Sequence, residues 1–280
     1  MLDNSNGEAF TDAPYFNQNY IKANHIKRIS GFFTHKKMGD VLRETALKRE
    51  YLFDTLGKLI QKYETVEAKN GYDTLVTQYE YTSNGLLEII RKSDQFGFNA
   101  VHYTYDSLGR VIREEIRRHL NQNGSRVRFN LSEEYLVTFE TSSYENYARQ
   151  QKRIFYNNYN QPYREEITYL DESGSITSRL DRLLRTSGTK KTEYFYNEKN
   201  WIDSIQVFNN QTGNKNSAFS FIYDNYGNLD TKNTFDKGIH TTQIQLIYDK
   251  KTMRLDYILS REVATNYMTI LKLDNYEKYD

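Results

Sequence analysis

The chain has no cysteine and only two prolines among its 280 residues. Without cysteine it can form no disulfide, no thiol nucleophile and no cysteine-ligated metal site. The two prolines and 14 glycines argue against a disordered linker protein, whose composition is usually rich in such residues. No run approaches the roughly 18 apolar residues that a membrane-spanning helix needs. These absences leave one large domain, or a repeat array that behaves as one.

The net charge of the chain is also close to zero. The chain has 38 Lys and Arg residues against 37 Asp and Glu residues, a formal net charge of +1. Such a chain has no overall field that would recruit nucleic acid or an acidic membrane. We therefore expect neither partner.

What the sequence has in abundance is aromatic side chains, 25 Tyr and 15 Phe, and many of them recur in a short motif. The fullest copy, His102–Val111, has alternating aromatics, a polar turn that ends in glycine, and the start of a second strand. Self-similarity at a recurring spacing indicates a repeat architecture. Further copies lie at Tyr51–Leu59, Tyr79–Leu87, Tyr194–Ile202, Phe221–Leu229 and Leu246–Leu255.

Each copy carries the chemistry of a tight turn. In the copy that begins at Asp106, the aspartate can accept a hydrogen bond from the backbone two residues on, and Gly109 at the fourth position tolerates positive φ. The last copy, Asp249–Thr252, lacks glycine or asparagine at that position, which predicts a looser turn. Turns of a second kind, such as Asn123-Gly124 and Lys237-Gly238, close the other end of each unit. Turns every dozen or so residues are typical of an all-β meander.

The strands between the turns show two further patterns. Residues two apart share a face, so Tyr103 and Tyr105 point to the same side of the sheet. We expect them to form cross-strand ladders with the equivalent aromatic residues of the other units. Segment 39–67 also has apolar residues at helical spacing, but its copy of the motif favours strands. In the later units the alternate positions are apolar too, which predicts that the C-terminal half buries both sheet faces. These positions are Phe155, Phe195, Ile222 and Ile247.

The motif Tyr-x-Tyr-Asp-x-x-Gly-Arg-[Leu/Val] resembles the YD repeat of the RHS family of bacterial proteins. Tyr103–Val111 matches it almost residue for residue, Phe221–Leu229 has Asn in place of Arg, and Tyr51–Leu59 has Phe and Lys substitutions. The resemblance implies an all-β fold of repeated antiparallel hairpins, laid side by side in a long twisted or spiralled sheet. The chain is far too short to close the toxin shell of large RHS proteins, so we expect only the scaffold to carry over.

The resemblance also bears on location. Repeat proteins of this kind are often exported, whereas Met1–Gly7 lacks the basic and apolar regions of a secretory signal. We expect a protein of the periplasm, the outer membrane or the cell surface, with a signal missing from the N-terminus. A lipid anchor on such a trimmed N-terminus is compatible with this expectation, and a cytoplasmic protein is the alternative.

Three regions follow from the motif and from the composition around it. Residues 1–23 are polar and aperiodic, which predicts an N-terminal arm that lies on the body. Residues 24–262 form the predicted β-repeat domain, with a degenerate unit in its middle. Residues 263–280 form the predicted C-terminal tail.

No motif for catalysis, a cofactor or a metal stands out. No two of the histidines His25, His35, His102, His119 and His240 sit at metal-ligand spacing, which argues against a zinc site. Adjacent glutamates such as Glu114-Glu115 point to opposite faces of a strand and cannot act together on one bond. Ion pairs with arginines explain them better. The arginines between Arg110 and Arg128 lie among glutamates that cancel their field, which argues against a nucleic-acid surface.

We therefore predict a protein that is not an enzyme and that serves as a scaffold or recognition subunit in a bacterial cell-envelope complex. Its partner is another protein, and function is expected where the motif decays: the arm, residues 121–151 and the tail. Sheet edges also invite strand addition by a partner. The alternative is a glycan-binding surface of exposed Tyr and Trp side chains. The candidate contact residues are Tyr15, Phe16, Tyr20, Tyr144, Tyr147, Trp201, Tyr267, Tyr276 and Tyr279.

Overall fold

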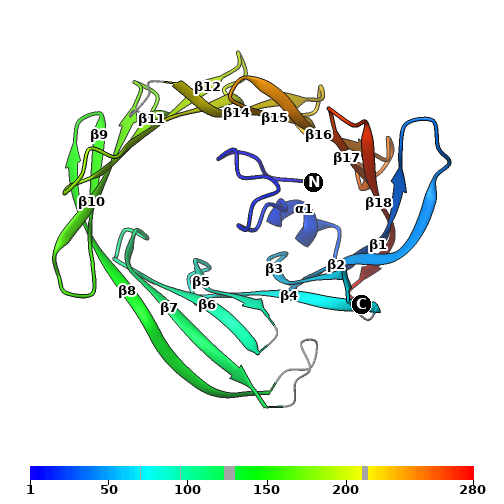
Figure 1. Ribbon diagram of the computed structural model, residues 1–280, viewed down its shortest axis with the longest axis horizontal. Coiled ribbons are helices and arrows are strands. Elements are labelled where there is room, and N and C mark those ends of the chain that lie inside the picture. Colours follow the sequence, from blue (N-terminus) through cyan, green and yellow to red (C-terminus); the bar gives the residue numbers. More distant parts are fainter. Residues whose placement is uncertain (70, 95, 123–129, 210–213) are drawn as a thin grey trace. The chain divides into compact units, whose positions relative to one another are not determined.

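The computed structural model describes residues 1–69, 71–94, 96–122, 130–209 and 214–280. They form one helix, α1 (Gln18–Ala23), and 18 strands, so the predicted all-β antiparallel fold is confirmed. Among these residues, no helix is long and apolar enough to cross a membrane. The chain divides into two compact units, unit 1 (Met1–Leu59 and Lys190–Asp280) and unit 2 (Ile60–Thr189), which can be followed by colour in Figure 1.

Unit 2 is an antiparallel meander in which each strand pairs with the next strand in the sequence. Its strands are β3 (Leu59–Ala68), β4 (Gly71–Tyr81), β5 (Leu87–Ser93), β6 (Gly97–Tyr105), β7 (Val111–Asn121), β8 (Leu131–Tyr147), β9 (Gln150–Tyr156), β10 (Pro162–Leu170) and β11 (Ile176–Leu183).

Unit 1 combines both ends of the chain. Strands β12 to β18 form a second meander, β18 then pairs with β1, and β1 pairs with β2. The strands are β1 (Ile26–Lys36), β2 (Arg43–Phe53), β12 (Thr189–Tyr196), β13 (Ile202–Asn209), β14 (Asn214–Tyr223), β15 (Leu229–Asp236), β16 (Ile239–Tyr248), β17 (Leu255–Glu262) and β18 (Tyr267–Lys278).

The structure corrects the predicted C-terminal tail, residues 263–280. Most of this segment is β18, which lies between β17 and β1 and pairs with both. Leu271 and Leu273 are buried, whereas Lys272 and Asp274 between and beside them are exposed. This alternation is the pattern of a half-buried strand, but the polar composition of the segment obscured it.

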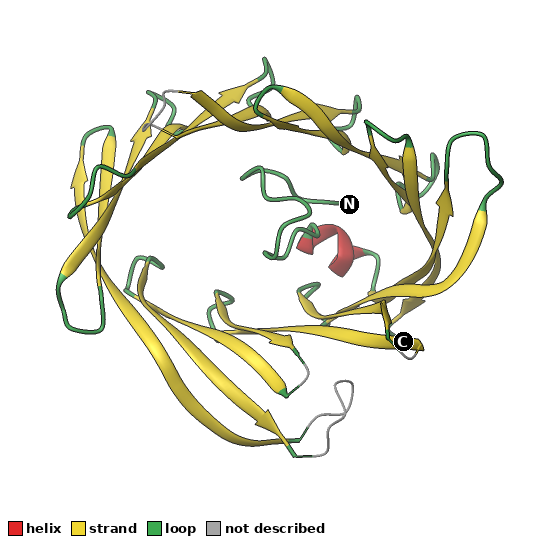
Figure 2. Ribbon diagram, viewed as in Figure 1, coloured by secondary structure: helices red, strands yellow, loops and turns green. Residues whose placement is uncertain are grey.

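The turns form as their chemistry predicts. Asp106 Oδ1 accepts hydrogen bonds from the backbone N–H groups of Leu108 and Arg110, both at 2.9 Å, and Gly109 has a φ of 74°. Figure 2 shows such turns as short loops between strands. The same two acceptor contacts recur at Asp54, Asn157, Asp171, Asn197 and Asp224.

The last copy of the motif makes a longer turn, as its missing fourth-position glycine predicts. Asp249 N–H donates to the Arg254 carbonyl at 2.8 Å, one residue further on than in the copy at Asp106. Met253 takes the positive φ, 56°, that glycine or asparagine takes elsewhere. The second kind of turn is seen at Lys237-Gly238, where both φ values are positive, whereas Asn123-Gly124 lies outside the described residues.

Two predictions about the strands have different outcomes. Segment 39–67 is confirmed as strand, because it contains β2 and most of β3. The predicted burial of both faces in the C-terminal half is wrong for Phe195, Ile222 and Ile247, which are exposed. An apolar residue at an alternate position therefore does not require a second covering layer, and single exposed apolar residues are common on protein surfaces.

Tyrosine hydroxyls extend the strand pairing past its last backbone pair. Tyr248, near the end of β16, donates to the carbonyl of Leu229 at 2.8 Å, and Leu229 is the first residue of the neighbouring strand β15. The motif tyrosine therefore has a hydrogen-bonding role in addition to its ring. The same bond joins Tyr105 to Leu87, Tyr144 to Val111, Tyr223 to Ile202 and Tyr276 to Leu255.

These half-buried tyrosines predict a loss of stability at high pH. Burial raises the pKa of Tyr105 to about 12 and raises the pKa of Tyr248 as well, against about 10 in an unfolded chain. The hydroxyls are protonated in both states below pH 10, so their contribution is complete there and is lost as the pH rises through 10 toward 12. Urea unfolding between pH 8 and 12 should show this decline in the free energy of unfolding.

A matched pair of variants isolates the effect. Tyr248→Phe should cost about 1 kcal/mol at pH 8 and make the alkaline decline shallower, because one raised pKa is removed. Tyr226→Phe, at an exposed turn position, should change neither quantity. An alkaline decline as steep in Tyr248→Phe as in the parent protein would contradict the assignment.

The N-terminal segment 1–23 packs against the unit 1 sheet. Phe16 lies edge-on to Tyr51 and Phe53 of β2, with ring centroids 4.8 and 5.0 Å apart. Lys232 Nζ of β15 donates to the Ala9 carbonyl at 2.8 Å. In Figure 1 this segment and α1 lie against one face of the unit 1 strands. One short segment thus contacts strands that are well separated in the sheet order, so the sheet of unit 1 curves around it.

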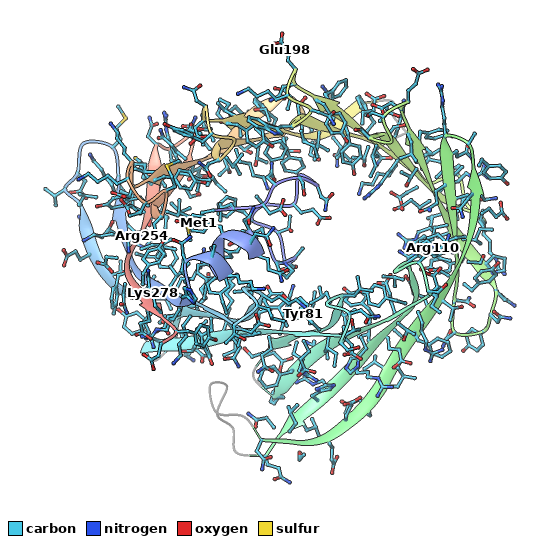
Figure 3. The ribbon with its side chains drawn as sticks, turned by 180° about the vertical axis from the view of Figure 1, so that it is seen from behind. Met1, Tyr81, Arg110, Glu198, Arg254 and Lys278 are labelled. Atoms are coloured by element: carbon cyan, nitrogen blue, oxygen red, sulfur yellow. The ribbon has the colours of Figure 1, made fainter. Side chains whose placement is uncertain are left out.

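The first residue contacts the same sheet. The backbone N–H of Leu255, at the start of β17, donates to Met1 Sδ at 3.1 Å, and Figure 3 labels Met1 close to Arg254. Leu2 forms a β-bridge with Phe16. The segment therefore folds back on itself before it meets the strands.

Candidate functional site

The structure places the predicted contact residues in three different situations. Tyr15 and Phe16 belong to the N-terminal segment and are buried, so they offer no free surface. Tyr144 and Tyr276 are half-buried and use their hydroxyls in the strand-to-strand bonds described above. Tyr147, near the end of β8, is 59% exposed.

The remaining candidates have partners within unit 1. Tyr20 donates to the Thr252 carbonyl at 2.8 Å, and Tyr279 donates to the Phe53 carbonyl. Trp201 is half-buried beside Tyr223, with Lys199 Nζ 4.8 Å from its ring centroid. Tyr267 stacks on His35. The candidates therefore do not gather into one surface.

The degenerate unit contains a different feature, an open strand edge. β7 pairs with β8 from Leu131 to Thr141, whereas β9 pairs with β8 only from Thr141 to Tyr147. Within the described part of unit 2, the second edge of β8 has no strand partner from Leu131 to Glu140. Figure 2 shows this stretch of β8 continuing beyond the end of β9.

The open edge is also exposed on both faces. All residues from Leu131 to Thr138 are exposed, and the large apolar ones include Tyr135 (51%), Leu136 (43%) and Val137 (58%). Proteins usually protect such edges with lysine, proline, bulges or a covering segment. Residues 131–140 contain no lysine or proline, although β7 leaves Ser132 and Val137 unopposed at two register shifts.

A cavity of about 460 Å³ lies at the fork where β8 and β9 separate. Thr138, Phe139 and Glu140 line it from the end of the open edge, and Asn157 and Asn158 line it from the turn after β9. Its size falls in the usual range for a binding pocket. Tyr103, Glu114, Ile116 and Tyr163 are among the other lining residues.

Two carboxylates meet at this cavity. Glu114 of β7 and Glu140 of β8 lie directly opposite each other in the strand register, and such like-charged pairs are destabilising unless they are compensated. Arg153 Nη2 bonds Glu114 Oε1 at 2.7 Å. Tyr163 donates its hydroxyl to Glu140, and burial together with this bond raises the pKa of Tyr163.

The two arginines next to these carboxylates pack on an aromatic ring. Arg164 lies over Phe155, 3.6 Å from the ring centroid, and Arg153 lies over the same ring at 4.2 Å. Arg164 Nη2 is 3.7 Å from Glu140 Oε1, which is beyond hydrogen-bond distance. Glu140 therefore accepts a hydrogen bond from a neutral hydroxyl, while its ion pair with Arg164 is long.

The adjacent glutamates behave as ion-pair partners, as predicted. Glu115 bonds Arg113 and Arg117 on the other face of β7, while Glu114 bonds Arg153. Arg113 and Arg117 are thus paired with a carboxylate, whereas Arg126 and Arg128 lie outside the described residues. The cross-strand meeting of Glu114 and Glu140 had no signal in the sequence, because it depends on the register of β8.

The structure also brings together His102, His119 and Glu134, which the search for ligand spacing missed. Potential ligand atoms of all three lie within 4.8 Å of one another. The spacing gave no signal because the residues lie on three different strands, β6, β7 and β8.

The hydrogen bonds of this cluster fit a proton-sharing network better than a metal site. Arg91 Nε donates to His119 Nδ1 at 3.1 Å, so the hydrogen of the neutral ring is on Nε2. His119 Nε2 lies 3.3 Å from Glu134 Oε2 and 3.4 Å from His102 Nε2. Because Nδ1 accepts the bond from Arg91 and carries no hydrogen, a metal bound at Nε2 would require the ring to lose its remaining hydrogen. Burial lowers the pKa of both histidines, which keeps them neutral at pH 7.

Comparison with known proteins gives only distant similarities. No family model matches the chain, and no curated protein matches it. A porin-like protein from Bacteroides uniformis is 11% identical, with 76% of this chain and 96% of that chain covered and a TM-score of 0.27. A LolA superfamily protein from Nitrosomonas europaea is 12% identical, with 94% and 93% covered and a TM-score of 0.19.

The toxin structure TcdB2-TccC3, without its hypervariable C-terminal region, is 13% identical over 84% of this chain, with a TM-score of 0.23. This chain spans only 15% of the length of that one. All three TM-scores are too low to support an argument about fold or function, so the open edge and the cavity have to be interpreted from their own chemistry.

Proposed function

We propose that the protein is a non-catalytic recognition protein that binds an extended segment of another protein by strand addition to β8. The observation that carries the proposal is the open edge from Leu131 to Glu140, which has no strand partner within the described part of unit 2 and bears exposed apolar side chains on both faces. An added strand would form backbone hydrogen bonds along this edge, which supply affinity, while side-chain contacts supply specificity.

Burial of apolar surface supports the same interpretation. Tyr135, Leu136 and Val137 are consecutive and exposed, and each buried Å² of apolar surface is worth roughly 25 cal/mol. An added strand beside β8 would cover the flanks of these side chains. Without a partner, the edge remains a site at which other chains can pair and aggregate.

We also propose a cellular location for the protein. We place the protein in a cell-envelope complex, exported to the periplasm or the cell surface, and we assign it no enzymatic activity. Glycan binding remains the alternative function. The hydroxyls of Tyr144, Tyr276 and Tyr279 donate to backbone carbonyls, which leaves these rings less available to sugars than the sequence suggested.

Strand addition is tested with a random library of ten-residue peptides displayed on phage and selected against the whole protein. Enriched peptides are synthesised, and their Kd values are measured for the parent protein and for the single variants Tyr135→Pro and Leu136→Pro. Neighbouring backbone N–H groups in a strand point to opposite edges, so one of the two prolines blocks the outer edge. That variant should bind at least tenfold more weakly, because ladder hydrogen bonds are lost.

Ile239→Ser serves as the control, because it alters an exposed apolar residue on unit 1 and should leave peptide binding unchanged. Thermal unfolding of each proline variant separates edge blocking from loss of the β7–β8 pairing. If no peptide is enriched, or if both proline variants bind the peptides as tightly as the parent does, strand addition at β8 is wrong.

A further inference from the structure

We propose that the cavity at the fork of β8 and β9 receives one cationic side chain, lysine or arginine, from the bound segment. This inference rests on the proposed strand addition and specifies the partner: an extended peptide with a basic residue at one defined position.

The geometry places one end of an added strand at the cavity. β9 leaves β8 at the Thr141–Tyr156 pair, and the open edge begins with the next residue, Glu140. A strand added along this edge would be roughly collinear with β9 and would end where the turn at Asn157 begins. Glu140 and Asn157 both line the cavity, so a side chain at that end of the peptide is positioned to enter it.

The chemistry of the lining selects a cation. Glu114 and Glu140 contribute two carboxylates, and no lysine or arginine is among the described residues that line the cavity. Arg153 bonds Oε1 of Glu114, and a carboxylate can accept further hydrogen bonds on its second oxygen. Glu140 accepts from the neutral Tyr163 hydroxyl and forms a long ion pair with Arg164 at 3.7 Å. An incoming ammonium or guanidinium group would therefore add a positive partner within hydrogen-bond distance of these carboxylates.

Aromatic rings suit the rest of such a side chain. Tyr103 and Tyr163 line the same cavity and can pack against the methylene groups of lysine or arginine.

Acidic residues on the open edge also favour a basic segment. Glu133 and Glu134 lie on β8; Glu134 is bonded to Arg117, and Glu133 forms no ion pair with another of the described residues. A basic segment is thus complementary to both the edge and the cavity, whereas an acidic segment is repelled by both.

The test is a double-mutant cycle on a peptide enriched by the phage selection. Its basic residue is replaced by norleucine, which keeps the apolar stem and removes the charge. Both peptides are measured by calorimetry against the parent protein and against Glu140→Gln. The basic peptide should lose about 10- to 100-fold in affinity on Glu140→Gln, whereas the norleucine peptide should bind both proteins equally.

Glu67→Gln is the matched control, because it removes an exposed carboxylate from β3 of the same unit, outside both the open edge and the cavity lining, and it should change the affinity of the basic peptide by less than about threefold. Glu114→Gln provides a second variant if Glu140→Gln lowers the melting temperature. Enriched peptides that bind the edge without a conserved basic position, or a cycle with no coupling to Glu140, would overturn this inference and leave strand addition intact. Failure of the edge variants to affect binding would overturn both.

Discussion

Replacing Gly31 with alanine is expected to disrupt unit 1 by separating β1 from β18. Gly31 lies opposite Leu273 of β18 and Arg49 of β2. A Cβ at this position would overlap the backbone carbonyl of Lys272, and a backbone atom in a paired strand cannot move aside as a flexible side chain can. Overpacking of this kind costs about 1–3 kcal/mol and at times more, and we expect the upper end. Urea unfolding monitored by circular dichroism measures the change.

Gly39→Ala provides the control for this substitution. Gly39 lies in the turn between β1 and β2, and a Cβ there would meet no atom within 4 Å. Its φ of +75° makes alanine strained, at a cost of roughly 1 kcal/mol. If Gly31→Ala is no more destabilising than Gly39→Ala, the close approach of β1 and β18 is not essential to the fold.

Replacing Phe16 with alanine is expected to release the N-terminal segment from the unit 1 sheet. Phe16 is buried, and its ring contacts Tyr51 and Phe53 edge-on. Removing it would leave a cavity beneath the segment, and truncation of a buried phenylalanine costs about 3–5 kcal/mol. The loss should appear both as a lower free energy of unfolding and as faster tryptic cleavage after Lys22, which follows on α1.

Phe96→Ala is the comparison for that variant. Phe96 is exposed in unit 2, so its removal should change stability by less than about 0.5 kcal/mol. Equal stability of the two variants would show that segment 1–23 contributes little to unit 1. A cleavage rate at Lys22 that does not change in Phe16→Ala would argue against release of the segment.

The features that the sequence predicted correctly are those whose cause is local. Asp106 and Gly109 are three residues apart and determine the turn between them by their own hydrogen bonds and φ preference. The alternation of the motif likewise identifies the strands on either side. The helical spacing within 39–67 did not prevail, because the turn at Asp54 fixes the two flanking strands.

The features that could not be predicted from the sequence depend on contacts between distant segments. Nothing near Leu271 or Leu273 shows that β18 would lie beside β1, because their partner strand is at the other end of the chain. The open edge of β8 arises because β9 is shorter than β8, which no local pattern revealed. Glu114 and Glu140 meet only because two register shifts in β8 bring them opposite each other.

The candidate site was predicted in region but not in residues. The interval 121–151 contains the open edge, yet Tyr144 within it is held by its bond to Val111. Tyr144 and Tyr147 were predicted as contacts because tyrosine is common in binding surfaces. The edge of β8 instead exposes backbone groups and apolar residues such as Val137, and composition does not distinguish paired from unpaired backbone.

The pairing of β1 with β18 has a consequence for the order of folding during synthesis. Every strand of unit 2 pairs with its neighbour in the sequence, so each hairpin can close as soon as it is made, and local contacts of this kind form fast. β1 is made before any of them, but one of its edges has no partner until β18 is complete. We expect unit 2, which is inserted between the two parts of unit 1, to be folded while β1 and the N-terminal segment still wait for the last strand.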